Sequence, residues 1–265
     1  MNKLIKITLL NLCIFSSALH AQVTLTWQNH TQTYPQAIRL TEALMPLMQP
    51  AYGNSDDTAD GFSSNDISSI YWPAAALYET QETKVAPLQA QRQRLLEKLT
   101  TLHQRFANDD RALLSAIDQL TQVVNSWQLG KRSPIKIDLD LARIQPPNNP
   151  LLTEGDYTLS AKPRSDKVFI TGAVNQTRVV AHQAYQDVSQ YVPASMRIDK
   201  ANQDYVYVIQ AEGRVIFTPT AYWNKQHQEV MPGSLLFVPF NTSLFHPELA
   251  EVNDLVVSLA NNRLL

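Results

Sequence analysis

The sequence predicts an α+β protein of two small domains, with an antiparallel helical hairpin inserted in the first domain and an amphipathic helix at the end of the chain. Three patterns support this prediction. Apolar residues recur at heptad spacing between about residues 84 and 130, as in two helices packed along a common seam. From residue 135 onward apolar and polar residues alternate, which indicates strands. Each half of the chain also has a pair of strands followed by a short helix, an order typical of small α+β domains.

The first 21 residues are expected to be a signal peptide that does not belong to the fold. Lys3 and Lys6 form a basic start, residues 7–15 are a short apolar run, and cleavage is expected near Ala21. The apolar run is too short to span a bilayer, which takes about 20 residues. We therefore expect an exported, soluble protein that loses its one cysteine, Cys13, with the signal.

Composition narrows the possible functions. A single Cys excludes a disulfide framework and a cysteine-based zinc site. A net charge of −2 gives no sign of nucleic-acid binding, which usually needs a strongly basic surface. Only seven glycines are present, which argues against glycine-rich phosphate loops.

The first domain is expected to span residues 22–162. Its strands are predicted at Val23–Trp27 and near Thr33–Leu40, followed by a helix capped by Thr41 that runs to about Met48. Residues 54–65 form a polar loop that resembles a calcium loop, but Ile67 stands where calcium requires a carboxylate, so no metal is expected. The aromatic cluster at residues 71–73 is expected to return to the core.

The inserted hairpin is the clearest periodic feature. Each of its two helices has an apolar seam at alternating spacings of three and four residues. The seam residues are Leu88, Leu95, Leu99, Leu102 and Phe106, then Leu113, Ile117, Leu120, Val124 and Trp127. Gly130 is expected to end the second helix.

Further strands are expected from residue 135 to residue 246, with the second domain at residues 163–246. The predicted strands cover residues 135–141, 152–159, 168–173, 178–181, 205–210, 215–218 and 235–240, with a short helix near 187–191. Residues 247–265 are predicted to form an amphipathic helix. This helix has three open interpretations: docking on its own domain, oligomer formation, or contact with a partner or a membrane.

Two groups of charged residues are candidate sites. Asp138 and Asp140 alternate along a predicted strand, so both carboxylates would share one face, as in a glycoside hydrolase if a substrate cleft held them. Residues 84–136 contain nine Lys or Arg against four Asp or Glu, so a basic hairpin could contact an acidic polymer or partner. The hairpin residues selected as contact candidates are Arg105, Arg111, Lys131 and Arg132. The alternative for the Asp pair is an exposed sheet face, and the alternative for the basic residues is a solvated helix surface.

Several segments resemble the GfcC-like family of capsule and exopolysaccharide export proteins. They include A-Y-W-N at residues 221–224, M-P-G-S-L-L-F-V-P-F at 231–240, D-Y-V-Y-V-I at 204–209 and E-G-R at 212–214. Y-W-P-A at 71–74 and G-K-R at 130–132 are similar to the first domain of that family. The resemblance implies two β-grasp (SLBB-like) domains, a periplasmic location, and no known catalytic activity or cofactor. Its implied partners are a Wza-type outer-membrane polysaccharide exporter or the surface polysaccharide itself.

Two hypotheses follow for the function. The favoured one is a non-enzymatic periplasmic accessory protein of polysaccharide export, and the rival is a carbohydrate-active enzyme that uses Asp138 and Asp140. No nucleic-acid partner is expected, and contact with a membrane is expected only through the C-terminal helix.

Overall fold

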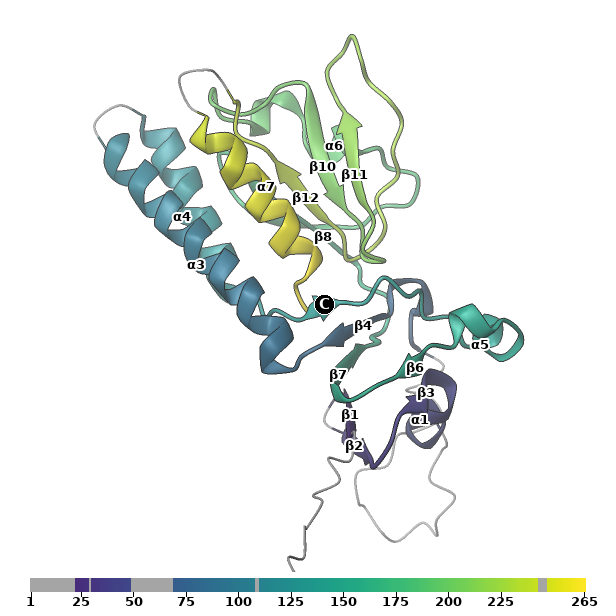
Figure 1. Ribbon diagram of the computed structural model, residues 1–265. Helices are drawn as coiled ribbons and strands as arrows, with labels where there is room; N and C mark the ends of the chain where they lie inside the picture. Colours follow the sequence, from purple (N-terminus) through teal and green to yellow (C-terminus); the bar gives the residue numbers. More distant parts are fainter. Residues whose placement is uncertain (1–21, 29, 49–68, 108–109, 243–246) are drawn as a thin grey trace, which may run out of the picture.

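The computed structural model describes residues 22–28, 30–48, 69–107, 110–242 and 247–265. The expected signal peptide, the polar loop at 54–65 and its calcium-like sequence lie outside the described residues. The described chain is a mixed α+β structure with two five-stranded sheets and a group of long helices (Figure 1).

The first sheet is built from strands that are far apart in the chain. Its order is β2-β1-β7-β4-β5, in which β1 and β7 are parallel and the other neighbours are antiparallel. The strands are β1 (Val23–Trp27), β2 (His30–Tyr34), β4 (Ala76–Glu79), β5 (Lys131–Arg132) and β7 (Gly155–Ser160). The inward residues of β1, Val23, Leu25 and Trp27, are buried, as the alternating sequence predicts.

Short elements surround this sheet. A two-stranded sheet joins β3 (Ile38–Arg39) to β6 (Leu151–Leu152). The helical segments are α1 (Leu40–Met48), α5 (Leu139–Ile144), and the 3-10 turns Trp72–Ala74 and Pro146–Asn148. Together they cover a core that includes Trp27, Leu44 and Leu159.

The second sheet has the order β11-β10-β12-β8-β9, with β8 and β12 parallel. Its strands are β8 (Lys167–Gly172), β9 (Arg178–Ala181), β10 (Tyr205–Ile209), β11 (Val215–Pro219) and β12 (Leu235–Val238). The short helix α6 (Val188–Tyr191) and the 3-10 turn Ala194–Met196 lie between β9 and β10 in the chain. All four residues of β12 are buried because elements pack on both faces of this sheet.

The two sheets share one strand order. When the five strands of each sheet are numbered along the chain, both sheets have the order 2-1-5-3-4, and the first and last strands form the central parallel pair. In the second sheet the third and fourth strands are joined by a tight turn at Gly213, which has a φ of 97°. In the first sheet the same connection, from β4 to β5, contains two long helices.

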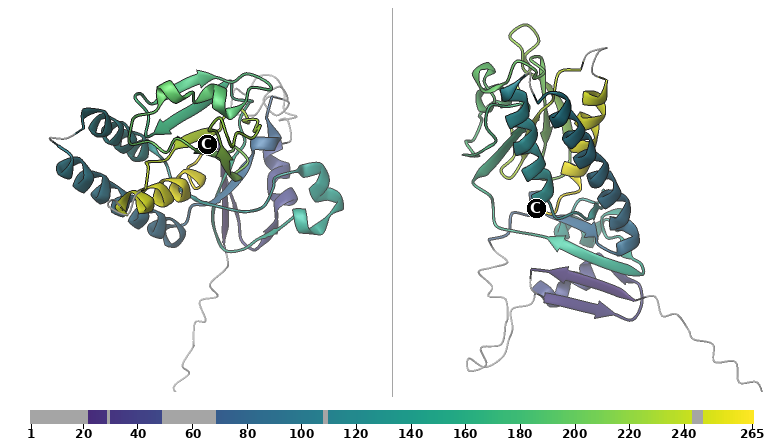
Figure 2. Two further views of the ribbon diagram at one scale, coloured as in Figure 1. Left: turned by 90° about the horizontal axis from the view of Figure 1, so that it is seen from above. Right: turned by 90° about the vertical axis from the view of Figure 1, so that its left-hand side faces the viewer.

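Two helices share a core with the second sheet although they are inserted between strands of the first. They are α3 (Glu82–Arg105) and α4 (Arg111–Ser126), and the last helix is α7 (Glu248–Asn261). α4 contacts β8, α7 contacts β10, and α3 contacts both α4 and α7 (Figures 1 and 2). The apolar seams of all three helices therefore belong to one core with the second sheet.

The helices form where their periodicity predicts them. The α3 residues Leu95 and Leu99 and the α4 residues Ile117 and Leu120 are buried at the predicted seams. α4 begins at Asp110, whose carboxylate accepts a hydrogen bond of 3.0 Å from the Leu113 N–H, as an N-cap residue does.

Four predictions about local structure are wrong. Residues 135–141 do not form a strand, because Asp138 caps α5 by accepting a 3.0 Å hydrogen bond from the Leu141 N–H. The second strand lies at His30–Tyr34, earlier than predicted, and Thr41 lies inside α1. Gly130 does not end α4, which stops at Ser126; a Cβ at Gly130 would lie 2.9 Å from Leu264 Cδ1, so this position needs glycine for close packing.

Candidate functional site

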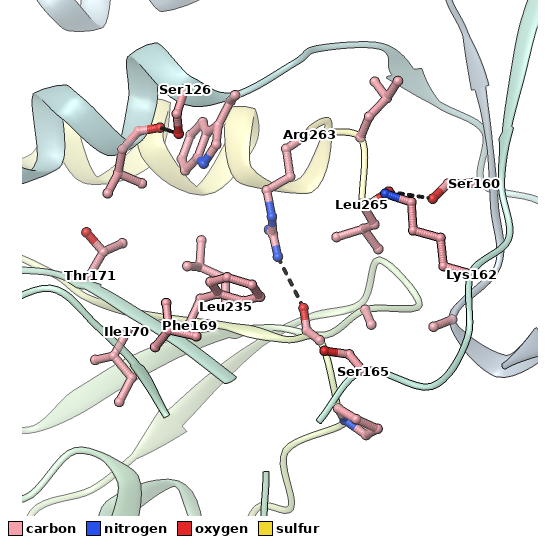
Figure 3. Close-up of a pocket in the computed structure, with 18 of the residues that line it drawn as sticks. Ser126, Ser160, Lys162, Ser165, Phe169, Ile170, Thr171, Leu235, Arg263 and Leu265 are labelled. Carbon is pink, nitrogen blue, oxygen red and sulfur yellow. Dashed lines mark hydrogen bonds between the residues drawn. The ribbon is translucent and has the colours of Figure 1, made fainter. Parts of the chain in front are cut away.

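A pocket of about 430 Å³ lies where the two sheets meet the end of the chain. The last turn of α4 and the residues after α7 form one wall, and β8, β9 and β12 form another. The segment that connects β7 to β8 closes the side nearest the first sheet (Figure 3).

The pocket wall is mainly apolar, with a few hydroxyl groups. Trp127, Phe169 and Leu235 supply large apolar surfaces. Several hydroxyls already have partners inside the protein: Ser126 Oγ donates to Val123 O (2.7 Å), and Ser160 Oγ donates to Leu265 O (2.8 Å). The hydroxyls therefore fix the shape of the wall more than they present unused donors.

The charged side chains among the lining residues are all basic: Lys162, Arg178 and Arg263. Arg263 is buried, and its side chain extends from the end of α7 toward β12 (Figure 3). Its guanidinium donates to Ala260 O (2.8 Å) and to Gly233 O (3.5 Å). Burial lowers the pKa of Arg263 to about 10, so the group stays charged at neutral pH.

A half-buried arginine, Arg132, connects the two sheets. Arg132 on β5 donates to the Tyr78 hydroxyl (3.1 Å) and to Ala211 O (2.7 Å), so it bridges β4 of the first sheet and the end of β10. Its guanidinium carbon also lies 5.5 Å from the centre of the Tyr78 ring. Burial lowers the pKa of Arg132, and burial raises the pKa of Tyr78 despite the two nearby arginines.

The structure separates the four predicted contact residues into two pairs. Arg105 ends α3 and Arg111 begins α4, whereas Lys131 and Arg132 form β5 beyond the other end of α4. α4 has 16 residues, so its two ends are about 24 Å apart at 1.5 Å per residue. The four residues therefore do not form one compact site.

Several basic residues of the hairpin region, including two of the four contact candidates, have acidic partners within the chain. Arg105 Nη1 lies 2.6 Å from Glu248 Oε1, and Lys131 Nζ lies 3.8 Å from Glu79 Oε1. Arg94 and Lys98 on α3 both pair with Glu251 on α7. Basic residues of α3 thus stabilise its contact with the last helix, and Arg111 remains as an exposed cation at the start of α4.

The carboxylate pair expected for a glycoside hydrolase is not formed as predicted. Asp138 is half-buried and accepts the capping hydrogen bond of α5, and Asp140 is a residue of that helix and not of a strand. Asp138 and Asp140 therefore do not lie on one strand face.

The described lining of the pocket consists mainly of apolar, hydroxyl-bearing and basic side chains. Its described lining residues include no Asp, Glu, His or Cys, so they supply no side-chain carboxylate or imidazole for proton transfer. Its apolar walls and basic groups suit an apolar ligand or side chain that has a neutral or anionic end. Within the described ranges no group of three or more His, Cys, Asp or Glu could hold a metal ion, and no helix is long and apolar enough to cross a membrane.

Sequence reasoning missed the residues that form this pocket. Trp127 is predicted on the apolar seam of the hairpin, but no sequence pattern marks Arg263 as a site residue. No local pattern marks the pocket itself, because the pocket walls come from segments more than a hundred residues apart.

Comparison with known proteins gives a match for both halves of the chain. Residues 62–164 match the family described as Capsule biosynthesis GfcC, N-terminal, and residues 176–265 match Capsule biosynthesis GfcC C-terminal. The chain is also 31% identical over 179 residues to an Escherichia coli K12 protein named Uncharacterized protein YjbG. That alignment covers 68% of this chain and 71% of the relative.

Proposed function

Since the chain belongs to the GfcC family of capsule biosynthesis proteins, we propose that it is a non-enzymatic periplasmic accessory protein of capsule or exopolysaccharide assembly and export. It acts through contacts with a Wza-type outer-membrane exporter or with the polysaccharide. The observation that carries this proposal is that matches to one capsule family cover both halves of the chain.

The proposed architecture is two β-grasp domains, at residues 22–162 and 163–246, with the α3–α4 helical hairpin inserted in the first and the helix at 247–265 following the second. The common strand order 2-1-5-3-4 with a central parallel pair supports two copies of one fold. The insertion at the connection that is a tight turn in the second sheet supports a hairpin added to a shared framework. These features favour an assembly module with extended contact surfaces.

A binding role is favoured over a catalytic one by the character of the pocket. Its described lining is apolar and basic, and Asp138 has a structural role as a helix cap. The exposed cation Arg111, at the start of α4, is available for contacts with an acidic polymer or partner protein, whereas Lys131 pairs with Glu79.

The test is complementation in a polysaccharide-producing strain that lacks the gene for this chain. We expect less surface polysaccharide in the deletion strain, and full recovery with both the wild-type protein and the double variant Asp138→Asn, Asp140→Asn. If the wild type restores surface polysaccharide but a folded and equally abundant double variant does not, the result would favour the enzyme hypothesis. Normal surface polysaccharide in the deletion strain would contradict the proposed function.

Cell fractionation tests the proposed location. The mature protein should be recovered from the periplasmic fraction with an N-terminus at Gln22, because cleavage is proposed after Ala21. Recovery of the uncleaved chain from the cytoplasm would contradict this part of the proposal.

A further inference from the structure

Aromatic side chains form an exposed strip at one edge of the second sheet, away from the pocket. The aromatic strip consists of Tyr205 and Tyr207 on β10, Phe217 on β11, and Tyr222 and Trp223 in the loop after β11. Phe217 is 54% exposed, Trp223 is 76% exposed and Tyr222 is fully exposed. Large aromatic groups are rarely left in water together without a binding role.

The strand part of the strip is held rigidly. Tyr207 is paired with Phe217 across the β10–β11 ladder, and Tyr205 is paired with Pro219. The ring centres of Tyr205 and Phe217 are 4.1 Å apart, and those of Tyr207 and Phe217 are 5.7 Å apart. Tyr207 also stacks on the buried ring of Phe237, which anchors the strip to the core.

The loop part is fixed next to the strand part by backbone hydrogen bonds. The N–H groups of Thr220 and Ala221 both donate to Asp204 O, at 2.8 and 3.3 Å. Since Asp204 directly precedes Tyr205, these bonds place Tyr222 close to the outer end of the strip. The buried Arg197 donates to the Thr220 hydroxyl at 2.6 Å, which further holds the loop. The aromatic groups are thus preorganised, and little ordering is needed on binding.

The polar groups around the strip indicate what it binds. Burial is the main cause that raises the pKa values of Tyr205 and Tyr207. The carboxylates of Asp254 and Asp204 raise the pKa of Tyr205 further, and Tyr205 and Asp254 raise that of Tyr207 further. Both phenols are therefore neutral, and neither hydroxyl has a hydrogen-bond partner among the described residues. Two cations lie next to the strip: Lys225 is paired with Asp187 at 3.7 Å, and Arg197 is buried beside Thr220 and interacts with Asp204. The surroundings are acidic and rich in hydroxyl groups, which disfavours anionic polymers and anionic lipid surfaces.

We propose that the aromatic strip is a binding platform for an uncharged pyranose segment of a polysaccharide. The apolar C–H faces of the sugar rings stack on the electron-rich faces of Trp223, Tyr222 and Phe217, and sugar hydroxyls bond to the tyrosine hydroxyls. This inference deepens the proposed function and rests on it, because the family match is what makes a polysaccharide the expected occupant.

Binding is tested with the full mature chain and the surface polysaccharide purified from the producing strain. The titration is followed by Trp fluorescence and by calorimetry, in the presence and absence of 0.5 M salt. At this salt concentration the Debye screening length is about 3–5 Å, so purely ionic binding is lost. We expect saturable binding that salt does not weaken, and at least about tenfold weaker binding for Trp223→Ala and Phe217→Ala. Trp223→Phe should retain most of the affinity. The matched control is Tyr185→Ala, because Tyr185 is 83% exposed but follows β9 at the opposite edge of the sheet.

Other outcomes would contradict the proposed binding platform. Absence of polysaccharide binding by the folded wild type, or equal affinity in the wild type and in Trp223→Ala, would contradict it. Binding of the wild type to neutral or anionic phospholipid vesicles through Trp223, without polysaccharide binding, would assign the strip to a membrane surface instead. If the platform fails while the wild type still restores surface polysaccharide in the deletion strain, the proposed function stands without this site.

Discussion

Gly172 at the end of β8 has a backbone conformation that other residues rarely adopt, with a φ of 106°. A Cβ at this position would lie 2.2 Å from the Val238 carbonyl oxygen of the parallel partner strand. Both the conformation and the close approach of β12 therefore require glycine. We expect Gly172→Ala to lower the free energy of unfolding by about 3 kcal/mol or more, measured by urea denaturation.

Gly233 provides a matched control for this prediction. Its φ is 86°, but a Cβ there would meet its nearest neighbour at 3.5 Å, an ordinary contact distance. Gly233→Ala should therefore cost only the conformational strain, about 1–2 kcal/mol. Equal losses in the two variants would show that the steric conflict at Gly172 has no effect.

Asp187 predicts a pH dependence of stability. Burial alone would raise its pKa, but hydrogen bonds from Ser189 and the Gln228 N–H, with Lys225 nearby, outweigh burial and lower the pKa below its usual value. A carboxylate with a lowered pKa stabilises the fold above its unfolded pKa of about 3.9, and this contribution is lost as the pH falls through the folded pKa.

The comparison variant for this prediction is Asp187→Asn. At pH 7 we expect the wild type to be more stable than the variant by about 1–2 kcal/mol, with the gap shrinking toward pH 3. Urea denaturation at pH 7, 5, 4 and 3 measures the gap. A gap that is constant over this range would contradict a lowered pKa for Asp187, because the uncharged Asn does not titrate.

At the scale of elements, long periodic segments could be predicted and short ones could not. α3, α4 and α7 bury the apolar stripes that their spacing indicates, and strands such as β8 and β9 lie close to their predicted bounds. β4 and β5 have four and two residues, so they are defined by their partners across the sheet and not by a local pattern. The alternation at residues 135–141 was misleading because a capping Asp can start a helix regardless of such alternation.

One buried polar side chain, Asn253, adds hydrogen bonds to the apolar docking of α7. Asn253 accepts a hydrogen bond from the Phe240 N–H and donates one to Phe240 O, both at 2.9 Å. It therefore pairs both backbone polar groups of Phe240, which follows β12. We expect Asn253→Ala to lower the free energy of unfolding by about 2–4 kcal/mol, because two buried backbone groups lose their partners.

Ser258→Ala is the control for this helix, since Ser258 is exposed on α7 and should change stability by about 0.5 kcal/mol or less. Thermal and urea denaturation measure both variants. A loss in Asn253→Ala no larger than in the control would contradict the proposed anchoring of α7.

At the scale of the whole molecule, the packing of α3 and α4 on the second sheet could not be predicted. These helices lie between strands of the first sheet in sequence, yet they share a core with the second. The sequence pattern shows that an apolar seam must be covered, but it does not specify which surface covers it. The pocket has the same origin, since its walls meet only once the two sheets are placed side by side.

Arg132 is expected to hold the two sheets in their relative position. It was predicted as a contact residue, and the structure shows it in bonds to Tyr78 and Ala211. Arg132→Ala should lower the free energy of unfolding by about 2–3 kcal/mol, because a buried carbonyl and a phenol lose a charged donor. The neighbouring variant Lys131→Ala is the control, since Lys131 is exposed and should cost at most about 0.5 kcal/mol. Equal stability of both variants would contradict a bridging role.

The central claim is that this protein works by contact within a polysaccharide export assembly. The most direct measurement is crosslinking mass spectrometry in living cells that produce both the chain and its outer-membrane exporter. The claim predicts crosslinks from this chain to the periplasmic part of the exporter, and their loss when the exporter gene is deleted. Abundant crosslinks within the chain but none to the exporter, together with no polysaccharide binding by the purified protein, would contradict it.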